Sequence, residues 1–201
     1  MARPILFVSA AVLAAGAGLA ASFALSRDGG ADCFDGAVAG AEIGGPFTLV
    51  DQTGATVTDA QVIDRPTLVY FGYAFCPDVC PVDVARNLAA VDLAAESGVD
   101  ARAVLITVDP ARDTPEALAD YVSNLGGGLT GLTGSDEQVR AAADAYRVIY
   151  SRAGDDPDYY LMNHSAFTYL MLPDQGFATF FHRETPAGEI AETLACAASG
   201  D

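Results

Sequence analysis

Lysine is absent from this 201-residue chain, and basic side chains of any kind are scarce. Ten arginines stand against 27 aspartates and glutamates, which gives a net charge of −17. In residues 28–201 eight arginines remain against all 27 acidic residues, so the charge there is −19. Because a surface this acidic repels phosphate backbones and anionic lipid headgroups, the composition argues against nucleic-acid binding. It is compatible with a basic protein partner, with attraction of cations, or with solubility alone.

Charge of either sign is also missing between Pro4 and Leu25. As a helix these 22 residues would be about 33 Å long, enough to cross a hydrocarbon core of about 30 Å. Arg3 precedes the run, so the positive-inside rule keeps the N-terminus in the cytoplasm. We therefore predict a membrane anchor over residues 1–27. A cleaved signal peptide is the alternative, since alanine-rich sequence precedes Ser26. In both interpretations the remaining chain is exported from the cytoplasm.

The rest of the chain is predicted to contain a linker at residues 28–41 and one folded domain at residues 42–201. The linker is rich in glycine, other small residues and acidic residues. In the domain, apolar runs bounded by turn residues predict strands, and capping residues or prolines before periodic segments predict helices. The predicted strands cover 47–50, 55–58, 66–73, 103–108, 147–151, 165–172 and 177–182, with a short one inside a glycine-rich loop at 126–134; the predicted helices cover 81–95, 115–125, 135–145 and 187–198.

These strands and helices alternate and end in a hairpin around residues 173–176, which indicates an α/β fold with a mixed sheet flanked by helices. A cysteine pair similar to a C-x-x-C motif stands where the strand at 66–73 gives way to the helix at 81–95. This pair makes a thioredoxin-like sheet the predicted architecture. Junctions of this kind are also where α/β sheets place their sites.

Cys76 and Cys80 form that pair, in the segment FGYAFCPDVCP. If residues 75–80 form a single turn, their spacing of four places both sulfurs on the same side, where they can converge on one atom. We expect Cys80, just before Pro81, to have a lowered thiol pKa because the helix N-terminus stabilises a thiolate. Thiolates bind Cu(I) and attack disulfides, so the pair indicates a metal carrier or a thiol-disulfide exchange protein. An inert disulfide between the two is the remaining alternative.

A further ligand is available in His164, on the approach to the predicted strand at 165–172. In a thioredoxin-like sheet this position adjoins the cysteine loop, and an imidazole would complete a two-sulfur, one-nitrogen set suited to copper. A lone histidine can equally be a hydrogen-bonded structural residue, so spacing alone leaves both interpretations open. His182 has no comparable neighbours.

No arginine or lysine lies between Pro66 and Val84, which argues against a peroxidase, whose thiolate needs a nearby cation.

Charged residues around these positions have alternative roles. Asp78, between the two cysteines, could tune the thiolates or stand near a metal, or it could be a turn residue after a proline. Asp109, Arg112 and Asp113, in TVDPARDTP, could form an ion pair or a partner-facing patch, or a network that braces the loop. For this group we expect the bracing role.

The other two cysteines lie near opposite ends of the chain that follows the predicted anchor. Cys33 begins the folded region and Cys196 nearly ends it. Disulfides persist in exported domains, so we predict that these two cysteines are joined. The bridge would close a loop of about 160 residues, for which the chain-entropy model gives on the order of 5 kcal/mol. Two unpaired thiols near flexible ends are the alternative.

Three segments together resemble the SCO/SenC family of membrane-anchored, thioredoxin-like copper proteins: FGYAFCPDVCP, TVDPARDTP and YLMNHSAFTYLMLPDQGF. They occur in the family's order, and the resemblance extends over about residues 42–198. It implies that Cys76, Cys80 and His164 bind a copper ion, as Cu(I) or Cu(II). Members of the family often have an aspartate before the ligand histidine, where this chain has Asn163, so the affinity for copper can differ.

The resemblance also implies a function in assembling the dinuclear copper site of cytochrome c oxidase. We predict a single-pass protein of the bacterial inner membrane whose domain faces the periplasm and delivers copper to the receiving oxidase subunit. The alternative is a thiol-disulfide oxidoreductase, in which Cys76 and Cys80 are the redox pair that reduces the oxidase cysteines. Because both functions use the same sulfurs, copper binding and disulfide formation exclude each other.

Overall fold

A computed structural model describes residues 33–34, 42–156 and 159–199 of the chain. The predicted anchor at 1–27, and the predicted linker at 28–41 apart from residues 33–34, lie outside these residues. In the described ranges no helix is both long and apolar enough to span a bilayer.

A seven-stranded sheet forms the centre of the domain, in the order β2-β1-β5-β4-β3-β8-β9. β3 pairs in parallel with β4, and β4 with β5, whereas the pairs β1/β2, β1/β5, β3/β8 and β8/β9 are antiparallel. The predicted mixed sheet is therefore confirmed. Its strands are β1 Thr48–Asp51, β2 Thr56–Thr58, β3 Thr67–Gly72, β4 Arg102–Thr107, β5 Leu129–Thr133, β8 Thr168–Leu172 and β9 Gly176–Phe181.

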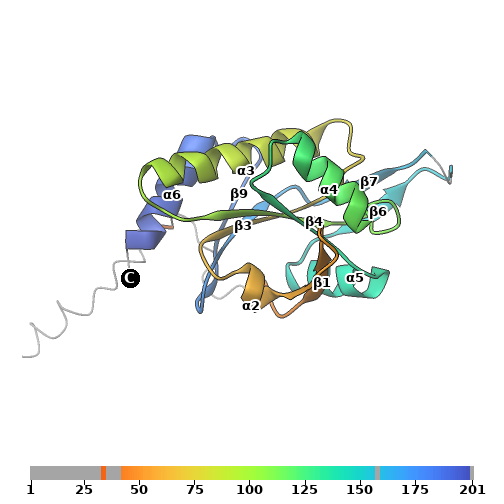
Figure 1. Ribbon diagram of the computed structural model, residues 1–201, viewed down its shortest axis with the longest axis horizontal. Coiled ribbons are helices and arrows are strands. Elements are labelled where there is room, and N and C mark those ends of the chain that lie inside the picture. Colours follow the sequence, from red (N-terminus) through yellow and green to blue (C-terminus); the bar gives the residue numbers. More distant parts are fainter. Residues whose placement is uncertain (1–32, 35–41, 157–158, 200–201) are drawn as a thin grey trace, which may run out of the picture.

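The central strand β3 is buried along its whole length, because helices cover both faces of the sheet. Side chains alternate along a strand, so Leu68 and Tyr70 point to one face and Phe71 to the other. Leu68 packs in an apolar cluster with residues of α3 (Val79–Glu96) and α6 (Ala187–Ser199). Phe71 contacts the tilted ring of Tyr146, the C-cap of α5 (Asp136–Ala145), with 5.2 Å between the ring centroids. Figure 1 accordingly shows α3, α4 (Pro115–Asn124) and α6 on one side of the sheet and α5 on the other.

Two of the four predicted helices begin after a residue whose side chain caps the helix. Thr114 Oγ1 accepts a hydrogen bond from the amide of Ala117 at the start of α4 (Pro115–Asn124). Ser135 does the same for Gln138 at the start of α5 (Asp136–Ala145). A short helix, α2 (Asp59–Val62), was not predicted.

Helix α3 begins at Val79, two residues before the predicted start at Pro81. Proline is tolerated there because amides in the first helical turn have no intrahelical acceptor to lose. The earlier start places Cys80 inside the first turn rather than ahead of it, with Asp78 at the N-cap. This shift decides which sulfur faces the free amides of the helix.

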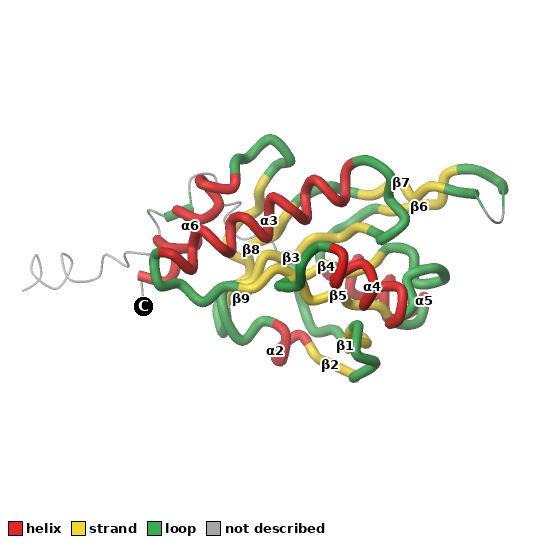
Figure 2. Tube along the Cα trace, turned by 45° about the horizontal axis from the view of Figure 1, so that its top comes forward, coloured by secondary structure: helices red, strands yellow, loops and turns green. Residues whose placement is uncertain are grey.

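The region before His164 differs from the prediction. A strand was expected at 147–151 within the central sheet, but the chain turns at Arg147, whose φ is 57°, while the Val148 amide donates to Ala143 O. This C-terminal cap of α5 directs the chain out of the central sheet. The strand forms later, as β6 (Tyr150–Ala153), and pairs with an unpredicted strand β7 (Leu161–His164) in a separate two-stranded sheet. Figures 1 and 2 show this hairpin projecting from the body of the domain.

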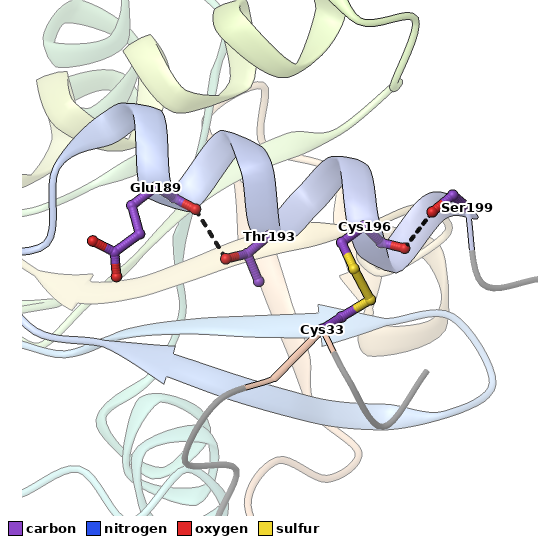
Figure 3. Close-up of a disulfide and its surroundings, with 5 residues drawn as sticks. All are labelled: Cys33, Glu189, Thr193, Cys196 and Ser199. Atoms are coloured by element: carbon purple, nitrogen blue, oxygen red, sulfur yellow. Dashed lines mark hydrogen bonds between the residues drawn. A yellow bond between two sulfur atoms is a disulfide. The ribbon is translucent and has the colours of Figure 1, made fainter. Parts of the chain in front are cut away.

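A disulfide joins Cys33 to Cys196, with the two Cα atoms 5.7 Å apart, as the sequence predicted. Figure 3 shows the bond holding the segment at Cys33 against α6. Next to it, Phe34 packs on the apolar cluster between α3 and α6. Residues 33–34 of the predicted linker are thereby held against the last helix of the domain.

Candidate metal centre

Two cysteines and one histidine converge at the end of the central strand. Cys76 lies in the loop after β3, Cys80 in the first turn of α3, and His164 at the end of β7. Their possible ligand atoms, two sulfurs and one ring nitrogen, all lie within 4.8 Å of one another, and both cysteines are free thiols. The structure thus brings together the three residues that the sequence singled out, although His164 lies 84 positions beyond Cys80.

The sulfur of Cys76 faces the N-terminus of α3. The amide of Cys80 donates to Cys76 Sγ at 3.4 Å. Burial raises the pKa of the Cys76 thiol, but hydrogen bonds from the Cys80 thiol and from the amides of Asp78, Cys80 and Val79 outweigh it, so the pKa is lowered. The thiol activated by the helix N-terminus is therefore Cys76, and the expectation that it would be Cys80 was wrong.

Cys80 itself is fully buried, and its sulfur packs over Gly72 of β3. Burial raises the pKa of the Cys80 thiol, and the hydrogen bond to Cys76 adds to the increase. Because Cys80 lies inside the first turn, its side chain points toward the sheet instead of the free amides. The two thiols thus differ: Cys76 is partly buried with a lowered pKa, and Cys80 is fully buried with a raised pKa.

His164 presents one nitrogen to the cysteines. Its Nε2 lies 3.3 Å from Cys80 Sγ, and its Nδ1 lies 3.0 Å from the carbonyl oxygen of Ser165. A carbonyl can only accept, so Nδ1 carries the proton and Nε2 keeps its lone pair. Burial lowers the pKa of His164, which favours the neutral ring that a metal requires. The rings of Tyr70 and Tyr73 meet the imidazole edge-on, at 6.0 and 5.9 Å, and fix its orientation.

A buried carboxylate behind the site was not singled out in the sequence. Asp83 of α3 is 1% exposed and accepts a hydrogen bond of 3.0 Å from the hydroxyl of Tyr70. Arg86 and Arg183 lie 3.6 and 3.9 Å from its two oxygens. The signal was available, because Asp83 follows Cys80 by three residues on the inward face of the helix. A charged residue on such a face needs partners, and here they include the tyrosine that contacts His164.

The loop that carries Cys76 is braced by the second motif, as expected. Asp113 is fully buried and accepts hydrogen bonds from the amide of Ala74 at 2.9 Å and from the hydroxyl of Thr107 at 2.6 Å. Its other oxygen, Oδ1, is buried without a hydrogen-bond partner. Burial raises the pKa of Asp113 to about 6, against the lowering effect of these two donors. This carboxyl therefore fixes the loop between β3 and Cys76.

The other half of the motif ties the hairpin to the body of the domain. Arg112 forms an ion pair with the buried Asp109 and donates to the carbonyl oxygen of Tyr160 at 3.0 Å. The Tyr160 hydroxyl in turn donates to Asp109 at 2.8 Å. Arg112 also lies over the ring of Phe75, 5.1 Å from its centroid, so a cation does approach the cysteine loop, with its charge matched by Asp109.

Three residues considered in the sequence lie outside this group of ligands. Asp78 is exposed at the N-cap of α3 and makes no side-chain capping bond. Asn163 is exposed and points to the opposite face of β7 from His164, because neighbouring side chains alternate in a strand. His182 is exposed and contacts the rings of Phe167 and Phe180.

Comparisons with known proteins agree with this geometry. The profile of the family described as SCO1/SenC matches residues 36–199. Protein SenC of Rhodobacter capsulatus is 50% identical over 158 residues, which is 79% of this chain and 72% of that protein. The crystal structure of Arabidopsis thaliana ScoI with copper bound superposes with a TM-score of 0.74 at 37% identity, covering 78% of this chain and 98% of that one.

A second solved structure, Bradyrhizobium japonicum ScoI with copper bound, has a TM-score of 0.69 at 36% identity and covers 76% of this chain and 97% of that one. Both likenesses extend over the described domain, and both support the thioredoxin-like fold predicted from the sequence. With a family profile that matches most of the chain and a relative at half identity, the chain belongs to the SCO1/SenC family.

Proposed function

We propose that this protein is a copper chaperone, in which Cys76, Cys80 and His164 hold one copper ion for transfer to another protein. One observation carries the proposal: two free thiols and a neutral imidazole nitrogen lie within 4.8 Å of one another. Soft thiolates with an imidazole form a donor set suited to copper. The copper-bound ScoI structures of Arabidopsis thaliana and Bradyrhizobium japonicum support the choice of metal.

Copper is the cargo in this proposal. When Cu(I) binds, both thiols lose a proton and His164 contributes a lone pair, so binding releases two protons and leaves the metal's oxidation state unchanged. Transfer then takes place by ligand exchange, with the half-exposed Cys76 as the ligand that an incoming group can reach and the buried Cys80 as the inner one.

The receiving protein and the location belong to the same proposal. We assign the acceptor as the copper-receiving subunit of cytochrome c oxidase, and the location as the bacterial inner membrane, with the domain facing the periplasm. The location rests on the uncharged run from Pro4 to Leu25. A variant lacking residues 4–25 is expected in the cytoplasm, whereas the full chain stays with the membrane after an alkaline wash.

A second candidate function is thiol-disulfide exchange at the same pair. The observation in its favour is the lowered pKa of Cys76, since the thiolate is the attacking species and helix N-termini activate it. The two functions differ in their need for His164. Exchange requires only Cys76 and Cys80, whereas a three-ligand copper site also requires the imidazole.

Anaerobic titration with Cu(I) against a competing chelator tests the proposal, using the reduced full chain in detergent. We expect one tightly bound ion, and at least about a tenfold loss of affinity in His164→Ala. His182→Ala is the matched control, because it removes an exposed histidine away from the site. A Cys33→Ser/Cys196→Ser variant ensures that the other two thiols do not bind the metal. Weak binding, or equal affinity in His164→Ala, would overturn the chaperone and favour the oxidoreductase.

A further inference from the structure

A pocket of about 660 Å³ opens beside the cysteine loop. Its lining comes from the cysteine loop, from the chain that leads into β7, and from Arg112. The lining residues are Phe75, Pro77, Arg112, Tyr159, Tyr160 and Leu161. Phe75 and Pro77 are the chain neighbours of Cys76, so the pocket lies against the loop that carries this cysteine. The opposite wall is the start of β7, the strand that ends at His164.

The pocket gathers apolar side chains that the fold leaves uncovered. Six large apolar residues are exposed in the part of the chain that the structure describes, and three of them line this pocket. These are Phe75, 56% exposed, Tyr159, 86% exposed, and Leu161, 51% exposed. An apolar surface that stays exposed and is concave marks a place where another molecule binds.

The lining favours an uncharged occupant. Of the six lining residues Arg112 alone is charged, and its guanidinium is already paired with Asp109. The same group stacks over the Tyr160 ring, 3.6 Å from its centroid, and so forms part of an aromatic wall. An apolar or aromatic side chain would bury itself here without displacing an ion pair.

Exposed carboxylates lie around the pocket, together with Arg152, whose guanidinium lies 3.9 Å from the centroid of the Tyr160 ring. Asp78 is exposed next to Pro77, and the exposed Asp120 lines an adjoining hollow together with Phe75. Asp155 is exposed in the turn between β6 and β7. With a net charge of −17 over the whole chain, these carboxylates attract basic groups around whatever fills the pocket.

We propose that this pocket docks an apolar side chain of the copper-receiving protein, carried next to a thiol and flanked by basic residues. The inference rests on the proposed function for the nature of the partner. Docking holds the acceptor thiol beside Cys76, and ligand exchange then occurs within one complex. The acceptor sulfur bonds to copper as the bond from copper to Cys76 Sγ breaks, and the proton lost by the acceptor thiol passes to the Cys76 thiolate.

Tryptophan fluorescence tests the docking step without copper, because this chain contains no tryptophan. The probe is the peptide Arg-Trp-Ser-Gly-Gly-Ser-Arg, whose serines replace thiols, titrated with the reduced full chain in detergent. We expect a saturable blue shift of the emission, with about tenfold weaker binding to Tyr159→Ser/Leu161→Ser. A peptide with glutamate in place of arginine should bind the wild type about tenfold more weakly than the arginine peptide does. Added salt should reduce this difference in affinity between the two peptides.

Ile149→Ser is the matched control, since Ile149 is 80% exposed but does not line the pocket. It should bind the peptide as the wild type does. No blue shift with the wild type, or equal affinity in the double variant, would overturn the docking site. A failure of copper binding in the separate Cu(I) titration would overturn the chaperone instead, and the fluorescence result does not depend on it.

Transfer kinetics give a second measurement on the same variants. The copper-loaded protein is mixed with the peptide Arg-Trp-Cys-Gly-Gly-Cys-Arg, and loss of copper from the protein is followed. The transfer rate should fall about tenfold in Tyr159→Ser/Leu161→Ser while the affinity for Cu(I) stays unchanged. An unchanged rate in this variant would contradict docking as a step in transfer.

Discussion

Nε2 of His164 lies 3.3 Å from Sγ of Cys80, a contact between the end of a projecting hairpin and the first turn of α3. Each partner is held from a different direction. The carbonyl of Ser165 orients the imidazole through Nδ1, and β3 supports the sulfur from below. The site is therefore sensitive to residues that provide no ligand, and most of the following predictions concern those.

Gly72 is expected to be indispensable beneath Cys80. A Cβ added there would lie 2.7 Å from the ring of Tyr70 and 3.2 Å from Cys80 Sγ. Gly72→Ala should lower the free energy of unfolding by about 1–3 kcal/mol through overpacking, and should weaken copper binding by displacing the sulfur. Urea unfolding and the Cu(I) titration measure the two effects. Gly188→Ala is the control, because nothing lies within 4 Å of its added Cβ, and it should leave both quantities nearly unchanged.

Asp83 and Tyr70 are expected to act as a pair. Asp83→Asn removes a buried charge and leaves the largely buried Arg86 without its carboxylate, which should destabilise the fold by about 3–5 kcal/mol. Tyr70→Phe removes only the hydroxyl, and should cost about 1–2 kcal/mol because a buried oxygen of Asp83 loses its donor. Denaturant unfolding of both single variants and of the double variant measures the coupling. Strictly additive effects would show that the hydrogen bond between them contributes nothing.

Asp113 should make stability depend on pH in an unusual direction. Burial raises its pKa from the ordinary value of 3.8 to about 6, so the folded protein holds this proton more tightly than the unfolded chain does. The stability from this group is fully present below about pH 4 and is lost as the pH rises through about 6. The loss should approach 3 kcal/mol, on the order of the difference between the two pKa values. The unfolding free energy of the wild type minus that of Asp113→Asn, measured from pH 4 to 7, should fall along this curve; a flat difference would contradict it.

Cys76 should react before Cys80. It is half-exposed and its pKa is lowered, whereas Cys80 is fully buried and its pKa is raised. Timed alkylation with iodoacetamide under non-denaturing conditions, read by peptide mass spectrometry, should modify Cys76 at least about tenfold faster. Cys80→Ser should retain the fast reaction and Cys76→Ser should lack it. Faster labelling of Cys80 would mean that the helix N-terminus activates the other sulfur.

The disulfide should affect stability without affecting the metal site. Cys33→Ser/Cys196→Ser frees the start of the domain from α6 and should lower the free energy of unfolding by about 2–5 kcal/mol. The copper affinity should stay the same, because neither cysteine belongs to the converging group. Thermal unfolding and the Cu(I) titration provide the comparison. A loss of copper affinity would imply that the bridge positions the site as well.

Much of the site was predictable because its signals are local. The spacing of Cys76 and Cys80, the buried strand before them and the capping residues Thr114 and Ser135 are read within a few positions of the chain. The position of β6 and the presence of β7 could not be predicted in this way. Each is a strand of four residues outside the central sheet, and its sequence carries little periodicity. His164 was singled out as a residue, but the hairpin that presents it was not.

The sequence alone determined the family resemblance, the α/β order, the terminal disulfide and the three converging residues. Only the tertiary structure decided that Cys76 faces the free amides of α3, that Asp83 accepts a hydrogen bond from Tyr70, and that an apolar pocket adjoins the site. The physical reason is the distance along the chain over which each effect acts. Capping and spacing act within one or two helical turns, whereas burial, pKa and pocket shape depend on which distant segments pack together.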